Sequence, residues 1–185
     1  MKYNEEQIIL SNGDAIVLRS PGAPDAEAML QYLLRTSGET YFMVRYPEEI
    51  ELSPEKLRQE EKFLESMENS PCNMMIAAFK GEELLGNIGL NCVGEQMKIR
   101  HRCNVGIAII KEAWGQGLGR RLMEAAVCSA RGLGFERVEL GVMEGNERAC
   151  RLYRSMGFRE CGRMPDAFRF RDGSSQDEIL MTLRL

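Results

Sequence analysis

A glycine-rich segment, Gly115-Gln116-Gly117-Leu118-Gly119-Arg120, joins a predicted strand to a predicted helix. The strand covers residues 99–110, and apolar residues then recur at the spacing of one helix face. A turn of this kind presents the free N–H groups of the first helical turn and the positive end of the helix dipole to an anion. We therefore predict an anion-binding turn, although the same glycines would also suit a simple tight turn.

Two common phosphate-binding fingerprints do not fit this segment. The dinucleotide-binding pattern requires glycine or alanine where Arg120 stands. The P-loop pattern requires Gly-Lys-Ser/Thr, which does not follow the glycines. The sequence therefore disfavours both of these nucleotide-binding classes.

Strands and helices alternate along the rest of the chain. We expect strands at residues 15–18, 74–79, 84–93, 99–110, 138–143, 159–170 and 178–185. We expect helices at about residues 26–38, 53–69, 117–133 and 146–156. The order β-α-α-β-β-β-α-β-α-β-β predicts a mixed α/β sheet with antiparallel edges and one parallel β-α-β crossover. No repeat or linker divides the chain, so we expect a single domain over residues 1–185.

Charge and cysteine content narrow the function further. The chain has 24 Lys and Arg against 28 Asp and Glu, a net charge of −4, which disfavours a nucleic-acid partner. Its six cysteines form no CxxC pair and there is one histidine, so we expect no metal site. The N-terminus lacks the pattern of a signal peptide, and no apolar run reaches the length of a membrane span. We expect a cytoplasmic protein without a membrane partner.

The glycine segment and a second motif together resemble the GNAT superfamily of acyl-CoA-dependent N-acyltransferases. Gly117 and Gly119 match the family loop Gln/Arg-x-x-Gly-x-Gly/Ala, whereas Trp114 stands where the loop has Gln or Arg. Residues 146–158 match the family's second motif, Asn-x-x-Ala-x-x-Leu-Tyr-x-x-x-Gly-Phe. The resemblance covers about residues 99–158 and implies the acyl-CoA N-acyltransferase fold, with a splayed central mixed sheet.

The resemblance also implies where acetyl-CoA binds. The strand edge Ile107-Ala108-Ile109 would pair with the pantetheine arm as an added strand does, although a buried core strand would have the same residues. Asn146 would contact the cofactor from its helix start, where an ordinary N-cap is the alternative. The pyrophosphate would lie against the loop residues Gly115, Gln116, Gly117, Leu118, Gly119 and Arg120.

Tyr153 is the expected catalytic residue. Attack of an amine on a thioester expels a thiolate, and a phenol with a pKa of about 10 beside the sulfur could protonate it as general acid. The alternative is that Tyr153 belongs only to the apolar stripe of its helix.

The sequence does not identify a general base. Related enzymes often place a glutamate on one of two strands, at positions that Cys103, Asn104 and Gly141 hold in this chain. An acceptor amine of low pKa would need little help, or water could relay its proton to a nearby carboxylate. The candidates for that relay are Glu139, Glu144, Asp166 and Asp177.

We therefore expect an N-acetyltransferase that moves the acetyl group of acetyl-CoA to a primary amine by direct attack in a ternary complex. The acceptor is left open between a small molecule and a peptide N-terminus, and a homodimer is also left open. The empty base positions motivate an alternative, a non-catalytic acyl-CoA-binding or regulatory module that kept only the cofactor site.

Overall fold

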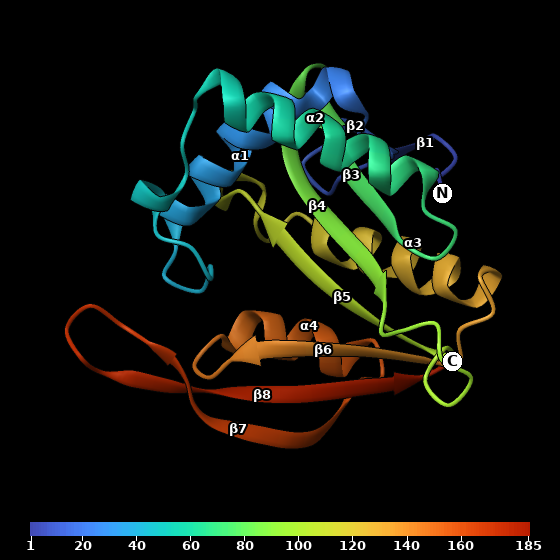
Figure 1. The fold of residues 1–185 in the computed structure, drawn as a ribbon, viewed down its shortest axis with the longest axis vertical. Helices are drawn as coiled ribbons and strands as arrows, with labels where there is room; N and C mark the ends of the chain where they lie inside the picture. The colour runs from blue at the N-terminus through green and yellow to red at the C-terminus, as the bar shows by residue number, and fades with distance from the viewer.

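Eight strands and four α-helices follow one another along residues 1–185 of the computed structural model. The strands are β1 (Glu6–Ile9), β2 (Ala15–Arg19), β3 (Met74–Lys80), β4 (Glu83–Cys92), β5 (Arg102–Ile109), β6 (Arg137–Met143), β7 (Arg159–Arg169) and β8 (Ser175–Arg184). The helices are α1 (Ala26–Glu39), α2 (Pro54–Asn69), α3 (Leu118–Gly132) and α4 (Glu147–Ser155). The strands form one mixed sheet in the order β1-β2-β3-β4-β5-β6-β8-β7 (Figure 1).

The predicted order of elements is confirmed, with one strand added before it. β1 pairs antiparallel with β2 and buries a single side chain, that of Ile8. A strand this short shows too little alternation to be predicted. The strand predicted from residue 99 begins at Arg102 instead, because residues 96–101 form a turn in which the Arg102 amide donates to the Ile99 carbonyl at 3.0 Å.

The helix ends follow the local signals in the sequence. Ser53 caps α2 by accepting a 3.2 Å hydrogen bond from the Lys56 amide. Gly134 has a φ of +80° after α3, and the Phe135 amide donates to the Ala130 carbonyl at 3.0 Å. This pair of features is the predicted Schellman motif, which satisfies carbonyl groups at the helix end.

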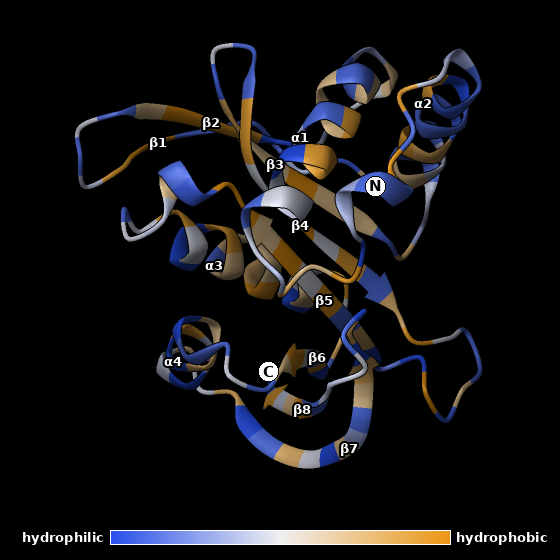
Figure 2. Cartoon of the chain, turned by 90° about the vertical axis from the view of Figure 1, so that its left-hand side faces the viewer, coloured by the Kyte–Doolittle hydropathy of each residue, from blue (hydrophilic) through white to orange (hydrophobic).

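The helices cover the sheet from both sides. Helices α1 and α2 lie on one face, and α3 and α4 lie on the other (Figure 2). The Tyr32 hydroxyl of α1 donates to Asn87 of β4 at 3.2 Å, whereas a Cβ at Gly86 would contact Leu122 of α3 at 3.4 Å. Apolar side chains fill both layers, and no helix has the length and hydropathy needed to cross a membrane.

The sheet opens between β5 and β6. These two strands are parallel, and they pair only where residues 102–104 face residues 137–139. Beyond this point β5 stays paired with β4 as far as Ile109, while β6 stays paired with β8 as far as Met143 (Figure 1). The predicted splay of the sheet is thus confirmed, and the carboxyl ends of β5 and β6 form the two sides of an opening.

Candidate active site

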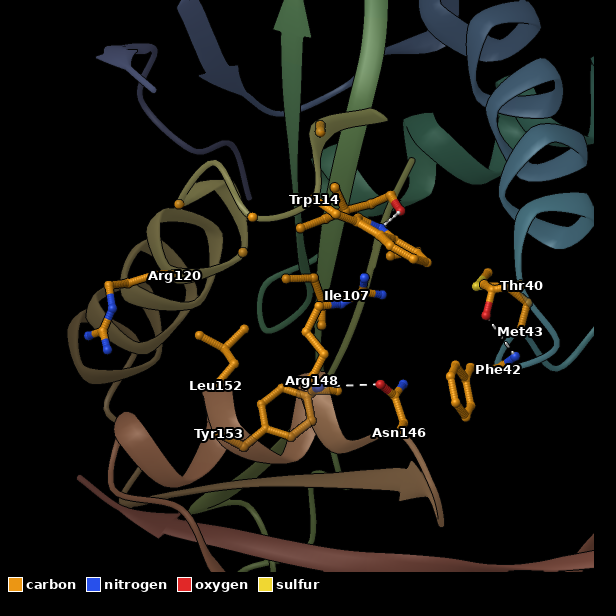
Figure 3. Close-up of a pocket in the computed structure, with 17 residues that line it drawn as sticks. Thr40, Phe42, Met43, Ile107, Trp114, Arg120, Asn146, Arg148, Leu152 and Tyr153 are labelled. Carbon is orange, nitrogen blue, oxygen red and sulfur yellow. Dashed lines mark hydrogen bonds between the residues drawn. The ribbon is translucent and has the colours of Figure 1, made fainter. Parts of the chain in front are cut away.

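A cavity of about 300 Å³ lies at this opening (Figure 3). Its walls come from the end of β5, the loop before α3, the first turns of α4 and the segment after α1. Most of the predicted site residues line it together: Ile107, Ala108, Ile109, Gly115, Gly117, Gly119, Arg120, Asn146 and Tyr153.

Each glycine of the loop has its own physical reason. Gly115 and Gly117 have φ angles of +77° and +87°, which L side chains rarely adopt, and a Cβ at either would meet no atom within 4 Å. A Cβ at Gly119 would lie 3.2 Å from Leu152 and 3.3 Å from Ile109, so this glycine lets α3 approach α4 and β5 closely. The loop therefore presents bare backbone and the amino end of α3 to the cavity.

Two predicted loop residues turn their side chains away from the cavity. Leu118 is completely buried in the core. The side-chain nitrogen of Gln116 donates to the Glu112 carbonyl at 2.8 Å, and its side-chain oxygen accepts from the Asn12 side chain at 2.9 Å. Only their backbone groups can serve the site, and their side chains hold the loop in place.

Tyr153 is buried against the core and is one of the residues that line the cavity. Its ring packs at a tilt against Phe158, with 6.0 Å between the ring centres. Burial, with a smaller contribution from Cys150, raises the pKa of Tyr153 to about 12. The phenol therefore stays protonated at neutral pH, as a proton donor must.

Asn146 caps α4, as its sequence position predicted. Its side-chain oxygen accepts a 3.2 Å hydrogen bond from the Ala149 amide. The residue also lines the cavity, so the cap and a cofactor contact are compatible.

Comparison with known proteins agrees with this geometry. The family model described as "Acetyltransferase (GNAT) family" matches residues 28–158, which is most of the chain. The chain belongs to the GNAT acetyltransferase family. The predicted enzyme class, an acetyl-CoA-dependent acetyltransferase, is confirmed at the level of the family.

One curated GNAT relative is similar to this chain in sequence. The N-alpha-acetyltransferase RimI of Mycobacterium tuberculosis is 33% identical over 93 residues, which cover 50% of this chain and 56% of that protein. The chain thus matches little more than half the length of this curated relative.

Solved GNAT structures match over nearly the whole chain. A GNAT acetyltransferase of Streptococcus pneumoniae superposes with a TM-score of 0.84 at 27% identity, over 92% of this chain and 99% of that one. The protein yncA of Salmonella typhimurium, solved with its cofactor acetyl-CoA, has a TM-score of 0.76 at 18% identity over 92% of this chain and 94% of that one. The second likeness shows the fold alone.

Trp114, which departs from the GNAT loop pattern, is bound on two sides. Its indole nitrogen donates to the Ile109 carbonyl at 2.7 Å, and the Arg148 guanidinium carbon lies 3.1 Å from the ring centre (Figure 3). Burial is the larger cause, and Arg151 the smaller, of a lowered pKa at Arg148. A positive charge from α4 thus lies beside a loop position whose own residue has none.

Arg148 was not predicted from the sequence. It occupies a variable position of the second motif, two residues after Asn146. Its place in the first turn of α4, beside the cap, was the signal that could have found it.

The cavity wall opposite Tyr153 was also not predicted from the sequence. Thr40, Phe42 and Met43, which follow α1, line the cavity there (Figure 3). The ring centre of Tyr41 lies 4.2 Å from that of Phe42 and 6.0 Å from that of Phe170 in the β7–β8 connection. The Tyr41–Phe170 contact behind this wall joins residues more than 120 positions apart, so no local pattern in the sequence predicts it.

No glutamate stands at the usual base positions, and three of the four predicted substitute carboxylates pair with arginines. Glu139 binds Arg102 through both oxygens, at 2.6 and 2.7 Å. Arg163 lies 2.6 Å from Glu144 and 3.7 Å from Asp177. Asp166 is exposed where the pairing of β7 with β8 is interrupted. Nothing in this geometry favours any of the four as base.

Burial also excludes Cys103, which occupies one of the three usual base positions, as the general base. Cys103 is completely buried, and desolvation, with smaller contributions from Glu139 and Cys92, raises the pKa of its thiol to about 12. The side chain cannot accept a proton as a thiolate at neutral pH. No group of three or more His, Cys, Asp or Glu side chains is arranged to hold a metal ion.

Proposed function

We propose that this GNAT protein transfers the acetyl group of acetyl-CoA to a primary amine by direct attack in a ternary complex. The observation that carries the proposal is the meeting of three features in one cavity: the end of β5, the bare glycine loop at the start of α3, and the protonated phenol of Tyr153. We also propose that residues 1–185 act as one catalytic domain, since a single sheet connects all of them.

The residues present fit acetyl-CoA. The open space over Gly115 and Gly117, with the amino end of α3 behind it, suits a pyrophosphate, and Arg120 adds a positive charge. Beyond residue 104, β5 has no strand partner on its β6 side. Apart from the Ile109 carbonyl, which accepts from the Trp114 indole, its backbone groups on that side are free to pair with an extended arm such as pantetheine. When bound, acetyl-CoA supplies an activated acetyl group on a thioester.

Tyr153 would act as general acid in this reaction. The neutral acceptor nitrogen bonds to the acetyl carbon and loses a proton to a base or to water, the carbon–sulfur bond breaks, and the Tyr153 hydroxyl protonates the departing sulfur. The Tyr153 phenolate then regains a proton through water. Because the pKa of Tyr153 is about 12, the hydroxyl keeps its proton at neutral pH, and that proton is available when the carbon–sulfur bond breaks.

An α-amine is the acceptor class that we favour. The curated relative is an N-alpha-acetyltransferase, which supports a peptide N-terminus as acceptor. An α-amine with a pKa near 8 also has a larger neutral fraction at pH 7 than a lysine side chain with a pKa of about 10.4.

The first test is thermal unfolding with acetyl-CoA, and with ATP and NAD as controls. A ligand at about 100 times its Kd stabilises the folded state by about 2.7 kcal/mol. We expect acetyl-CoA alone to raise the unfolding temperature; no shift would overturn the cofactor assignment.

A second test separates the enzyme from a non-catalytic acyl-CoA-binding module, which the empty base positions favour. Acetyl-CoA is mixed with a panel of short peptides bearing free α-amines and of small primary amines, and thiol release is followed. Turnover with any of them excludes the module, whereas binding without turnover supports it.

A further inference from the structure

Gly141 leaves a space on β6 that the carboxyl group of Glu178 fills. β6 pairs with β8 so that Gly141 lies opposite Leu180 and Met143 lies opposite Glu178. Glu178 is therefore a diagonal neighbour of Gly141 on the same face of the sheet. A Cβ at residue 141 would overlap Oε1 of Glu178 and lie 2.6 Å from its Cδ. The carboxylate stands where a side chain of residue 141 would stand.

This face of the sheet is opposite to the one that carries α4. Asn104 faces Glu139 in the parallel pair, and side chains alternate, so Asn104, Glu139 and Gly141 share a face. Asn87, which faces Ala108 on β5, lies on that face too and bonds to α1. Helix α4 lies on the other side of the sheet (Figure 2), and its residue Tyr153 lines the cavity. Glu178 and Tyr153 thus lie on opposite sides of the sheet: Glu178 lies over β6 where β6 is no longer paired with β5, and Tyr153 is among the residues that line the cavity.

Glu178 is free to act on a ligand. Its side chain is half-buried, and its cross-strand neighbours are Met143 on β6 and Met164 on β7, neither of which can pair with a charge. The carboxylate forms no ion pair, whereas the adjacent Asp177 shares Arg163 with Glu144.

A second group on the same strand also lacks a partner. Gln176 precedes Glu178 by two residues, so their side chains share a face of β8. Its Oε1 is buried without a hydrogen-bond partner, and it would lie 4.0 Å from a Cβ at Gly145. A buried acceptor without a donor requires an explanation. An amine brings N–H donors, which both this oxygen and the Glu178 carboxylate lack.

We propose that Glu178 is the general base of the acetyl transfer, with Gln176 as a positioning residue for the acceptor amine. This assignment rests on the proposed function. As the nitrogen–carbon bond forms, Glu178 accepts the proton that the nitrogen loses. As the carbon–sulfur bond breaks, Tyr153 donates its proton to the sulfur. Water returns the proton from Glu178 to Tyr153, so the products are an N-acetyl amine and free CoA thiol.

The test compares Glu178→Gln with the wild-type enzyme, using the amine that gives the highest rate in the acceptor panel. General acid–base catalysis contributes about 10²- to 10⁴-fold, so we expect kcat at pH 7 to fall by at least about 100-fold. The acetyl-CoA-induced thermal shift should be unchanged, which shows that the variant folds. The rate of the variant should recover as the pH rises, because the amine then loses its proton to water. Glu160→Gln, an exposed acid on β7, is the matched control and should keep the wild-type rate.

A carboxylate exchange provides a second readout. Glu178→Gly should be inactive, and the double variant Gly141→Glu/Glu178→Gly should regain at least about tenfold of the lost rate, since it moves the carboxylate from β8 to β6. Wild-type rates in Glu178→Gln at pH 7 would overturn the base assignment alone. A wild-type protein that binds acetyl-CoA but acetylates no amine would overturn the proposed function, and the base with it.

Discussion

The guanidinium carbon of Arg148 lies 3.1 Å from the centre of the Trp114 ring, so α4 supplies a cation to the start of the loop that precedes α3. The Trp114 indole is held in turn by the Ile109 carbonyl, the last carbonyl of β5. These contacts connect β5, the loop before α3, and α4, which line the cavity together.

Removing Arg148 should weaken acetyl-CoA binding. Arg148→Ala removes the cation beside the anion-binding loop and its contact with Trp114, which is worth about 0.5–2 kcal/mol. We expect the acetyl-CoA Kd to rise about tenfold by titration calorimetry. Arg148→Lys keeps the charge but loses the planar stacking on Trp114. Its acetyl-CoA Kd should therefore lie between those of the wild type and Arg148→Ala. Equal affinity in all three proteins would show that Arg148 does not serve the cofactor.

A carboxylate in the glycine loop should repel the cofactor. Gly117→Glu places a negative charge against the proposed pyrophosphate site, so we expect acetyl-CoA affinity to fall by at least about tenfold. Gly81→Glu is the matched control, because Gly81 also has a positive φ and open space around its Cα but lies in the β3–β4 turn. Both variants should lose about 1–2 kcal/mol of stability through the strained backbone, and only Gly117→Glu should lose affinity.

The elements and the place of the glycine loop before α3 were predictable from the sequence, because their signals are local. The Ser53 cap, the Gly134-Phe135 helix end and the glycines at 115 and 117 each act within a few residues. The stacking of Arg148 on Trp114 and the place of Glu178 over Gly141 join segments more than 30 residues apart. Strand pairing and helix packing create such contacts, and one sequence carries no pattern for them.

Loss of the Tyr153 hydroxyl should slow the reaction without affecting cofactor binding. Tyr153→Phe keeps the ring against Phe158 and removes the proton donor. We expect kcat to fall by about 100-fold or more while the acetyl-CoA Kd changes less than about twofold. An unchanged kcat would assign Tyr153 to packing alone.

The dependence of kcat on pH also tests the role of Tyr153. Because burial raises the pKa of Tyr153 to about 12, the folded protein keeps this acid protonated as the pH rises through 8 and 9. The kcat of the wild-type enzyme should therefore show no alkaline fall between pH 7 and about pH 10. A fall with an apparent pKa of 8 to 9 would mean that another group donates the proton.

Acetylation of an amine tests the central claim most directly. The wild-type protein is incubated with acetyl-CoA and the panel of α-amine peptides and small amines, and both free thiol and acetylated product are measured, the product by mass. We predict that one thiol is released for each acetyl group transferred, and only when an amine is present. Thiol release at the same rate without amine, or no transfer to any amine by a protein that binds acetyl-CoA, would contradict the account.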